Sequence, residues 1–476
     1  MQRITIDPIT RLEGHGKIEI FLNEEGDVAN TYFQIPELRG FERFCVGRPV
    51  EEMPLLTNRI CGVCPEAHHM AAAKAVDAVY HVDIPSTAKK LRELLYMAFY
   101  CTDHTTHFYA LGGPDFIMGP HAPVAERNIL GVIHKVGLEI GGKVIQMRKN
   151  GHNVVEIIGG RKVHPCTSIP GGLTKGITEE QRVEIEKMGR WAVEFAQFSL
   201  KVFNDIVLGN PKYVDLILGD IYTHHTYYMG LVDANNKVTF YDGKVRVVDP
   251  SGKEYVKYEP KDYADHIAEH VEPWTYLKFP YLKNIGWKGL VDGPDSGIYM
   301  ATPLSRLNAS DGMATPLAQA EYEKFYATLK GKPVHQRLAI HWARLVELAS
   351  DPEITSSNFR TLPTQTPEEG VGIVEAPRGT LTHHYKTDKN GLVTEANLIV
   401  GTTNNHAPIS MAIKRAAQKL IKPGGEVTQG LLNTVEMAFR LFDPCFSCAT
   451  HTLPGEMPLE VLVYNPDGVL YHHEKR

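Results

Sequence analysis

Four cysteines stand in two pairs of equal spacing at opposite ends of the 476-residue chain. Cys61 and Cys64 lie in RICGVCPEAHH, and Cys445 and Cys448 lie in FDPCFSCATH. A Cys-x-x-Cys pair can hold a metal, cycle as a disulfide or pack in a core. The pairs are too far apart in sequence for a compact zinc module. They can form one site only if the fold brings the two ends of the chain together.

The sequence around each pair favours a metal site. The first pair directly precedes a predicted helix, whose N-terminal dipole lowers the pKa of a thiol from its usual value of about 8.5. The second pair follows a predicted helix that Asp443 and Pro444 end. Four thiolates favour nickel, zinc or an iron–sulfur cluster. Spacing alone leaves two interpretations open: one shared metal site, or unrelated structural or redox cysteines.

The composition narrows the class of protein. Seven cysteines, an odd number, argue against a disulfide framework, and we expect Cys45, Cys101 and Cys166 to be small buried hydrophobic residues. A net charge of -6 argues against nucleic acid as a partner. No apolar run approaches the roughly 20 residues that span a bilayer, and the first residues lack a signal-peptide pattern. We therefore expect a cytoplasmic protein without a membrane span.

The elements that must position the cysteines are mostly helical. Alternation predicts strands within residues 1–35 around a turn at 23–27 and within 380–401, and an antiparallel insertion over 228–260. Helical periodicity predicts helices over 66–82, 86–111, 122–151, 178–207, 316–333, 335–351, 407–422 and 428–442. PLEVLVYNPDGVLYHH, near the end of the chain, reads as a hairpin. The expected fold is mainly α with small β additions (α+β), built on a large helical-bundle core.

Both cysteine sequences resemble the paired signatures of nickel–iron hydrogenase large subunits. The similarity extends to DPITRLEGHGK, RGFE, DHTTHFY and EAPRGTLTHHY, and so covers most of the chain. The related quinone-reductase subunits of respiratory complexes lack these cysteines, so their presence favours a metal-bearing hydrogenase. The resemblance implies that residues 1–451 form one large-subunit domain. The implied activity is the reversible heterolytic cleavage of dihydrogen into two protons and two electrons.

The same resemblance implies a nickel–iron centre. Cys61 and Cys445 would bind nickel alone, whereas Cys64 and Cys448 would bridge nickel to an iron that carries carbon monoxide and two cyanides. A residual negative charge on such a buried centre needs cationic or hydrogen-bonding partners.

A cap over this centre is implied by a second set of residues. Arg378 would lie near the cyanides, with Pro377, Asp103 and Asp443 completing the cap, and Thr402 would donate to the second cyanide. Three of these residues have a simpler interpretation. Arg378 could form a surface salt bridge, Asp103 could have an ordinary role on its helix, and Thr402 could be a plain strand residue.

Proton transfer and a second ion are implied by a third set. Glu13 matches a proton relay beside a terminal cysteine, and His68 matches a donor to a bridging sulfur. Glu42, the backbone carbonyl of Leu398 and His451 resemble the ligands of a separate ion, magnesium or iron.

Partners follow from what the chain lacks. No cysteines remain to build an iron–sulfur cluster here, so an iron–sulfur small subunit is expected to take the electrons. In most of the family a maturation protease removes a C-terminal extension after the histidine that matches His451, which predicts loss of residues 452–476.

The signatures look most like the cytoplasmic multimeric hydrogenases, above all the methanogen methyl-viologen-reducing type linked to heterodisulfide reductase. Deazaflavin-reducing and NAD-linked hydrogenases are close alternatives. A dihydrogen sensor of the same family is a further alternative. Sensors of this family generally lack a C-terminal extension, so residues 452–476 argue against it. A structural zinc or redox protein would leave RLEGH, RGFE and EAPRG unexplained.

Overall fold

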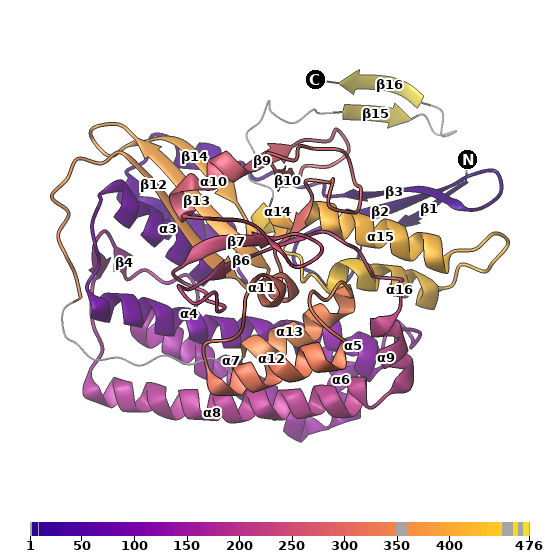
Figure 1. The fold of residues 1–476 in the computed structure, drawn as a ribbon, viewed down its shortest axis with the longest axis horizontal. Helices are drawn as coiled ribbons and strands as arrows, with labels where there is room; N and C mark the ends of the chain where they lie inside the picture. Colours follow the sequence, from indigo (N-terminus) through magenta and orange to yellow (C-terminus); the bar gives the residue numbers. More distant parts are fainter. Residues whose placement is uncertain (1, 8, 349–358, 450–459, 465–469, 476) are drawn as a thin grey trace.

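The computed structural model describes residues 2–7, 9–348, 359–449, 460–464 and 470–475, with the backbone alone for residue 2 and the last two ranges. A layer of long helices lies beneath several small sheets (Figure 1). In that layer α7 (Leu138–Gly159) packs against α4 (Ser86–Thr106) and α8 (Glu179–Phe203). Thr178 begins α8 with a capping box that it shares with Gln181. The predicted α+β class with a helical core is confirmed.

Shorter helices surround this layer. They are α1 (Phe41–Cys45), α2 (Met53–Leu56), α3 (Pro65–Val79), α5 (Gly113–Ile117), α6 (Ile129–Val136), α9 (Pro211–Leu218), α10 (Tyr263–His266), α11 (Pro303–Ala309), α12 (Pro316–Thr328), α13 (Ile340–Glu347), α14 (Gly401–Asn404), α15 (His406–Leu420), α16 (Gln429–Arg440) and α17 (Phe446–Ala449). Of these fourteen in the described residues, six overlap ranges that periodicity predicts, and the other eight were not predicted. The continuous helix predicted over 122–151 is wrong. Gly137, at φ 94°, separates α6 from α7, because a helix does not accommodate a positive φ. After α4 the chain continues as a π-helix over His107–Gly112.

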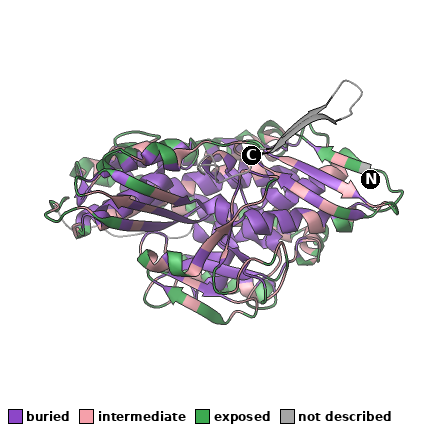
Figure 2. Ribbon diagram, turned by 90° about the horizontal axis from the view of Figure 1, so that it is seen from above, coloured by how far each residue is buried: buried purple, intermediate pink, exposed green. Residues whose placement is uncertain are grey.

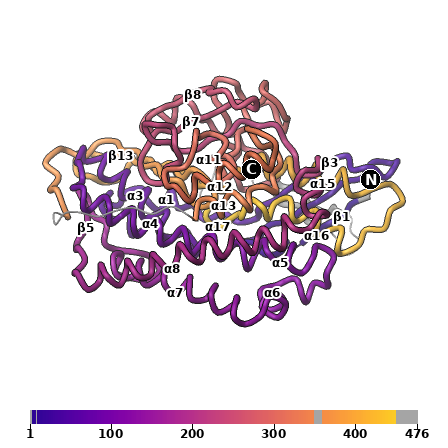
Figure 3. The backbone as a smooth tube through the Cα atoms, turned by 60° about the horizontal axis from the view of Figure 1, so that its bottom comes forward, coloured from indigo at the N-terminus to yellow at the C-terminus, as the bar shows by residue number. Residues whose placement is uncertain are grey.

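Small sheets lie on the other side of the helical layer. The N-terminal antiparallel sheet is β1 (Gln2–Ile6), β2 (Lys17–Leu22) and β3 (Val28–Gln34), with its predicted turn between β2 and β3. The predicted insertion is β6 (Tyr227–Val232), β7 (Lys244–Val248) and β8 (Glu254–Tyr258), antiparallel as expected, and β11 (Tyr299–Met300) adds a parallel strand. Figure 3 shows β7 and β8 on the face opposite α6 and α7.

The remaining strands form four further sheets. β12 (Glu369–Ala376), β13 (Gly379–Thr387) and β14 (Val393–Ile399) form an antiparallel sheet, in which β12 was not predicted. β4 (Ser168–Ile169) pairs with β5 (Gly172–Leu173), and β9 (Ile267–His270) pairs with β10 (Phe279–Leu282). β15 (Glu460–Tyr464) and β16 (Leu470–Lys475) form the predicted C-terminal hairpin.

Close packing of α3 on β12 sets the position of the first cysteine pair. A Cβ on Gly372 would lie 2.1 Å from the carbonyl oxygen of Ala71, and one on Gly370 would lie 2.3 Å from that of Ala75. Glycines on the strand and alanines on the helix therefore let the two backbones approach. The later strand residue faces the earlier helix residue, so the end of β12 lies at the start of α3, beside Cys64.

The two ends of the chain meet at the same place. Glu13 forms a parallel β-bridge with Cys445, and the amide of Phe446 donates to the carbonyl of Glu13 at 3.0 Å. α15 packs against β3 and α16, which holds the C-terminal helices against the N-terminal sheet. The centre of the molecule is extensively buried (Figure 2).

Candidate metal centre

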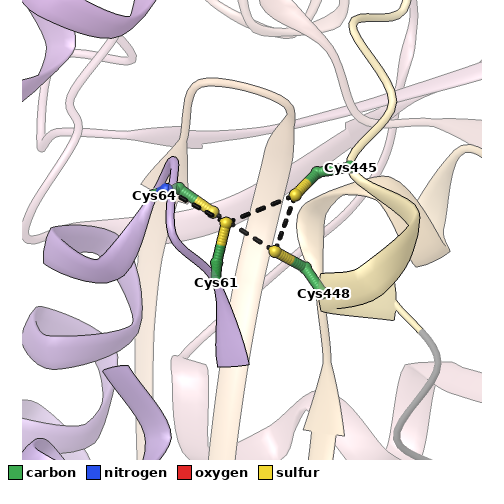
Figure 4. A group of neighbouring side chains, drawn as sticks. All are labelled: Cys61, Cys64, Cys445 and Cys448. Carbon is green, nitrogen blue, oxygen red and sulfur yellow. Dashed lines mark hydrogen bonds between the residues drawn. The ribbon is translucent and has the colours of Figure 1, made fainter. Parts of the chain in front are cut away.

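The four paired cysteines come together in one buried cluster (Figure 4). Their Sγ atoms all lie within 4.8 Å of one another. Sγ–Sγ distances are 3.4 Å for Cys61–Cys445, 3.5 Å for Cys64–Cys448 and 2.7 Å for Cys445–Cys448. All four are free thiols rather than disulfides. The fold thus brings the two ends of the chain together, as one shared cysteine site requires.

The start of α3 supports the first pair. Cys64 is the N-cap of α3, and the backbone amides of Val63 and Cys64 each donate to the Cys61 sulfur at 3.1 Å. Burial acts to raise the pKa of Cys61. Contacts with the other three sulfurs and the charge of Arg378 outweigh burial and hold that pKa well below its usual range. The cluster therefore favours holding a thiolate, the form in which cysteine binds a metal.

A tight turn between α16 and α17 supports the second pair. Asp443 has φ 55°, Pro444 follows, and Cys445 and Cys448 lie before and within α17. The amide of Cys445 donates to the Thr402 hydroxyl at 3.0 Å. Thr402 lies on the short helix α14 and not on a strand, so the strand alternative is wrong. Burial is the main reason that the pKa of Cys445 is raised well above its usual range.

Arg39, from the RGFE sequence, links the two cysteine segments. One of its nitrogens donates to the carbonyl of Ile60 at 2.5 Å and to that of Ser447 at 3.2 Å. These carbonyls lie beside Cys61 and Cys448. From RGFE only Glu42 was predicted, as an ion ligand, and this role of Arg39 was missed.

Glu13 lies directly against the cluster. Its Oε2 is 3.0 Å from the Cys445 sulfur and accepts the amide of Ser447 at 3.2 Å. The Ser447 hydroxyl donates to Oε1. A carboxylate in contact with one thiol and held by a second residue is placed to receive a proton from that thiol.

Arg378 is held between two carboxylates. Its guanidinium nitrogens lie 3.0 Å from Asp103 Oδ2 and 3.1 Å from Asp443 Oδ2, and all three side chains are buried. Burial acts to lower the pKa of Arg378, but these carboxylates and the cysteines raise it well above its usual range. Arg378 is therefore a permanent cation beside the cluster, and the surface salt bridge proposed as its alternative is wrong.

A fully buried ion network fixes the turn that carries Arg378. Arg306 donates to Glu347 at 2.7 and 3.0 Å and to Glu375 at 2.9 Å. Its other donations go to the backbone carbonyls of Ala376 at 3.0 Å and Pro377 at 3.3 Å. Because these two carbonyls precede Arg378, the network sets its position.

His107 supports the second carboxylate of the cap. Its Nδ1 lies 2.9 Å from Asp443 Oδ1, and its ring stacks on His341 with centroids 5.4 Å apart. Burial lowers the pKa of His107 well below its usual range. His107 is the first residue of the π-helix, and π-helical turns are frequent at functional sites.

His68 lies one helical turn after Cys64 on α3, fully buried. Its Nδ1 is 3.1 Å from Nε2 of His383 on β13. A hydrogen bond from His68 to a cysteine sulfur stays a prediction. His69, its neighbour, donates from Nδ1 to the carbonyl of Pro54 at 2.8 Å and so has a structural part.

Two of the three residues predicted to hold a separate ion lie side by side. Glu42 Oε1 accepts the backbone amide of Leu398 at 2.9 Å, and both residues are buried. His451 lies outside the described residues. The ion site therefore stays a prediction.

The donor set fits a nickel–iron centre. Four soft sulfur donors suit nickel and iron better than hard cations, and a buried cation beside them balances negative charge. Of the lone cysteines, Cys45 is buried as expected, but Cys101 and Cys166 are partly exposed.

Comparison with known proteins agrees with this geometry. A family described as nickel-dependent hydrogenase matches residues 39–129 and 327–451, and one described as HoxL-like matches residues 3–38. Similar relatives are two archaeal proteins named as subunits of F420-non-reducing hydrogenases. The one from Archaeoglobus profundus, named an iron-sulfur subunit, is 50% identical over 99% of both chains. The one from Methanothermobacter thermautotrophicus is 42% identical over 99% of both.

A bacterial relative and a solved structure extend the likeness. The beta subunit of the NAD-reducing hydrogenase HoxS of Cupriavidus necator is 35% identical over 100% of both chains. The crystal structure of an NAD+-reducing nickel–iron hydrogenase in the H2-reduced state superposes with a TM-score of 0.88 at 35% identity, covering 95% of this chain and 100% of that one. Within the described part of the chain, no helix is long and apolar enough to cross a membrane.

Proposed function

The chain belongs to the nickel-dependent hydrogenase family as a catalytic subunit that cleaves dihydrogen, and from this premise we propose how its residues build and serve a nickel–iron centre. The observation that carries the proposal is the cluster of four buried cysteine sulfurs within 4.8 Å of one another. Cys61, Cys64, Cys445 and Cys448 would hold nickel, and Cys64 and Cys448 would also hold an iron that carries carbon monoxide and two cyanides. When bound, this centre accepts the two electrons released as dihydrogen is cleaved into two protons.

Arg378 and Thr402 hold the diatomic ligands in this proposal. The guanidinium, fixed between Asp103 and Asp443, supplies positive charge and N–H donors on one side. The Thr402 hydroxyl accepts the amide of Cys445, so its own hydrogen stays available for a ligand on the other side. Pro377 completes the cap, and its carbonyl is tied to Arg306.

Protons leave through Glu13. The Cys445 sulfur lies 3.0 Å from Glu13 Oε2, which is hydrogen-bond reach. Ser447 holds the carboxylate through its amide and hydroxyl, so Glu13 is oriented before a proton arrives. His68 donates a hydrogen bond to a bridging cysteine.

A separate magnesium-type ion is bound by Glu42, the carbonyl of Leu398 and His451 and ties the C-terminal segment to the core. The contact between Glu42 and Leu398 supports this part of the proposal. Residues 1–451 form the functional domain, and a maturation protease removes residues 452–476 after His451. The family match, which ends at residue 451, supports this boundary. Mass spectrometry of the native protein tests the cleavage.

Electrons pass to an iron–sulfur small subunit in the cytoplasm and then to further subunits. The relatives are named as subunits of multi-subunit hydrogenases, which supports a complex of this kind. Heterodisulfide reductase is the first candidate acceptor. The archaeal relatives are named F420-non-reducing hydrogenases, which speaks against the deazaflavin as the acceptor. The NAD-reducing relative keeps NAD as the second candidate acceptor. Electron-transfer assays of the native complex with each acceptor would separate the two.

Infrared spectroscopy of the complex purified with its native partners tests the centre. Protein groups do not absorb where metal-bound carbon monoxide and cyanide do, so bands in that region are expected. Their absence from protein that has lost residues 452–476 would refute the nickel–iron centre and favour a zinc or redox cluster. Turnover of dihydrogen by the same sample separates an enzyme from a sensor.

A further inference from the structure

A chain of three polar side chains, those of His68, His383 and Tyr385, begins one helical turn beyond Cys64. His68 Nδ1 lies 3.1 Å from His383 Nε2, and His383 Nδ1 lies 2.6 Å from the Tyr385 hydroxyl. All three residues are completely buried. Neither His383 nor Tyr385 has a part in the function proposed above.

Strand geometry presents both residues to α3. His383 and Tyr385 are two apart on β13 and therefore face the same side of the sheet. His384, between them, faces the other side, where its ring nitrogens contact Tyr263 at 2.8 Å and Glu369 at 2.7 Å. α3 packs on β13, and His68 lies on it one turn beyond Cys64.

Proton positions along this chain are linked. A neutral imidazole has one donor nitrogen and one acceptor nitrogen, and a tyrosine hydroxyl has one hydrogen. If Tyr385 donates to His383 Nδ1, then His383 donates from Nε2 to His68 Nδ1, and the proton of His68 is on Nε2. If Tyr385 accepts from His383, the order reverses and Nε2 of His68 carries a lone pair.

In the reverse order, the Tyr385 hydroxyl hydrogen needs a different acceptor, and Thr57 can supply one. The Tyr385 hydroxyl also interacts with Thr57, whose own hydroxyl donates to the carbonyl of Met53 at 2.7 Å. Thr57 can therefore accept a hydrogen bond from Tyr385. The protein scaffold thus allows both orders, and the charge beside His68 selects one of them.

We propose that Tyr385, acting through His383, fixes His68 in the tautomer that carries its proton on Nε2 when the anionic metal centre is in place. His68 lies one helical turn beyond Cys64, and negative charge on the nearby thiolates favours an N–H over a lone pair on Nε2, the ring nitrogen that does not face His383. Tyr385 and His383 are positioning residues, and they tune the electron density of the centre. This inference rests on the proposed nickel–iron centre.

The test compares infrared spectra and midpoint potentials of three single variants and one double variant of the holoenzyme with the wild type. Tyr385→Phe removes the terminal donor and frees His383 to reverse. His383→Gln keeps an amide that can donate to His68 without depending on Tyr385. Tyr222→Phe is the matched control, because its buried hydroxyl donates to a backbone carbonyl, that of Thr434, at 2.7 Å and has no part in the chain.

We expect the carbon monoxide band of Tyr385→Phe to move to lower wavenumber or to split, and the midpoint potential to fall, at wild-type nickel content. Loss of an N–H donor near a thiolate raises electron density on the metals. Tyr222→Phe should match the wild type. Adding Tyr385→Phe to His383→Gln should change nothing further, because two residues that act through one chain are not additive.

Wild-type bands in Tyr385→Phe, or equal shifts in Tyr222→Phe, would overturn the inference while leaving the proposed centre intact. An additional shift when Tyr385→Phe is combined with His383→Gln would also overturn it, because Tyr385 would then act by another route. Absence of the bands from the wild type would overturn the centre and this inference with it.

Discussion

Glu13 and Cys445 lie in contact through both backbone and side chain, although one is near the start of the chain and the other near its end. A parallel β-bridge joins their backbones, and Glu13 Oε2 lies 3.0 Å from the Cys445 sulfur. The segment that supplies the proposed proton acceptor thus also anchors the segment that supplies two of the proposed metal ligands. Metal binding and proton transfer are coupled in structure and can be separated by substitution.

Glu13→Gln should separate them. The amide keeps the shape and can still bond to Ser447, but it does not accept a proton from Cys445. Because removing a positioned acid–base group costs about 10²–10⁴-fold in rate, we expect a fall of that order in dihydrogen oxidation, measured with a dye acceptor. Nickel content should not change. Glu24→Gln, in the turn between β2 and β3, is the control, and equal rates for both variants would count against the relay.

Arg378→Lys should show that the cap needs a fork of donors and not merely a charge. A lysine ammonium is a point charge that does not reproduce the paired contacts with Asp103 and Asp443. We expect turnover to fall by about 10²–10³-fold, as for the loss of an oriented donor. The measurement is the maximal rate at saturating dihydrogen and unchanged nickel content. A lysine variant with the wild-type rate would show that charge alone suffices.

Glu347→Gln should destabilise the whole fold rather than the site alone. Arg306 donates twice to Glu347, and both side chains have no exposed surface. Breaking a buried ion pair costs about 3–5 kcal/mol, and we expect the lower end of that range because Glu375 still pairs with Arg306 at 2.9 Å. We expect the urea midpoint to fall accordingly. Glu186→Gln, in an exposed pair with Arg190, is the control and should leave the midpoint in place.

This network marks the limit of what the sequence could predict. Helical and strand periodicity predicted most elements. The spacing of the cysteines showed that one shared site requires the two ends of the chain to meet, as they do in the fold. Arg306, Glu347 and Glu375 come from three separate segments. Both glutamates have apolar neighbours in sequence, and nothing near any of the three charges indicates its partner. Their meeting depends on how α11, α13 and β12 pack.

β12 was missed for a related reason. Its glycines weaken the strand pattern, because glycine has low strand propensity. Those same glycines are required by the approach of α3, a partner that is nearly three hundred residues away along the chain and therefore invisible to a local pattern. Tertiary contact, and not local preference, determines the residue type here.

Gly372→Ala should test that approach. The added methyl would lie 2.1 Å from the carbonyl oxygen of Ala71 and 2.4 Å from the amide nitrogen of Ala75, both backbone atoms, so α3 would have to move. Overpacking of this kind costs about 1–3 kcal/mol. We expect a lower urea midpoint and a lower nickel content, since α3 carries Cys64 at its start.

The matched control for this substitution is Gly189→Ala in α8, where an added Cβ meets nothing within 4 Å. Alanine in a helix interior should stabilise that variant by roughly 0.5–1 kcal/mol. A loss of stability at Gly189 equal to that at Gly372 would show that the contact between α3 and β12 is not the cause.

His69→Gln should change how stability depends on pH. His69 is completely buried, and burial lowers its pKa from 6.5 to about 4, against the opposing effect of its bond to the carbonyl of Pro54. The folded protein therefore binds this proton less readily than the unfolded chain. The stability that follows is complete above pH 6.5 and is lost as the pH falls from about 6.5 to about 4.

The size of this contribution follows from the shift, on the order of 3 kcal/mol across the window. We expect the urea midpoint of His69→Gln to fall less steeply than that of the wild type between pH 6.5 and pH 4. His134→Gln, an exposed histidine on α6, should follow the wild-type curve. Parallel curves for His69→Gln and the wild type would mean that the buried imidazole is protonated as easily in the fold as in the unfolded chain. Its burial and the donation of the Ser168 amide to its Nε2 oppose that outcome.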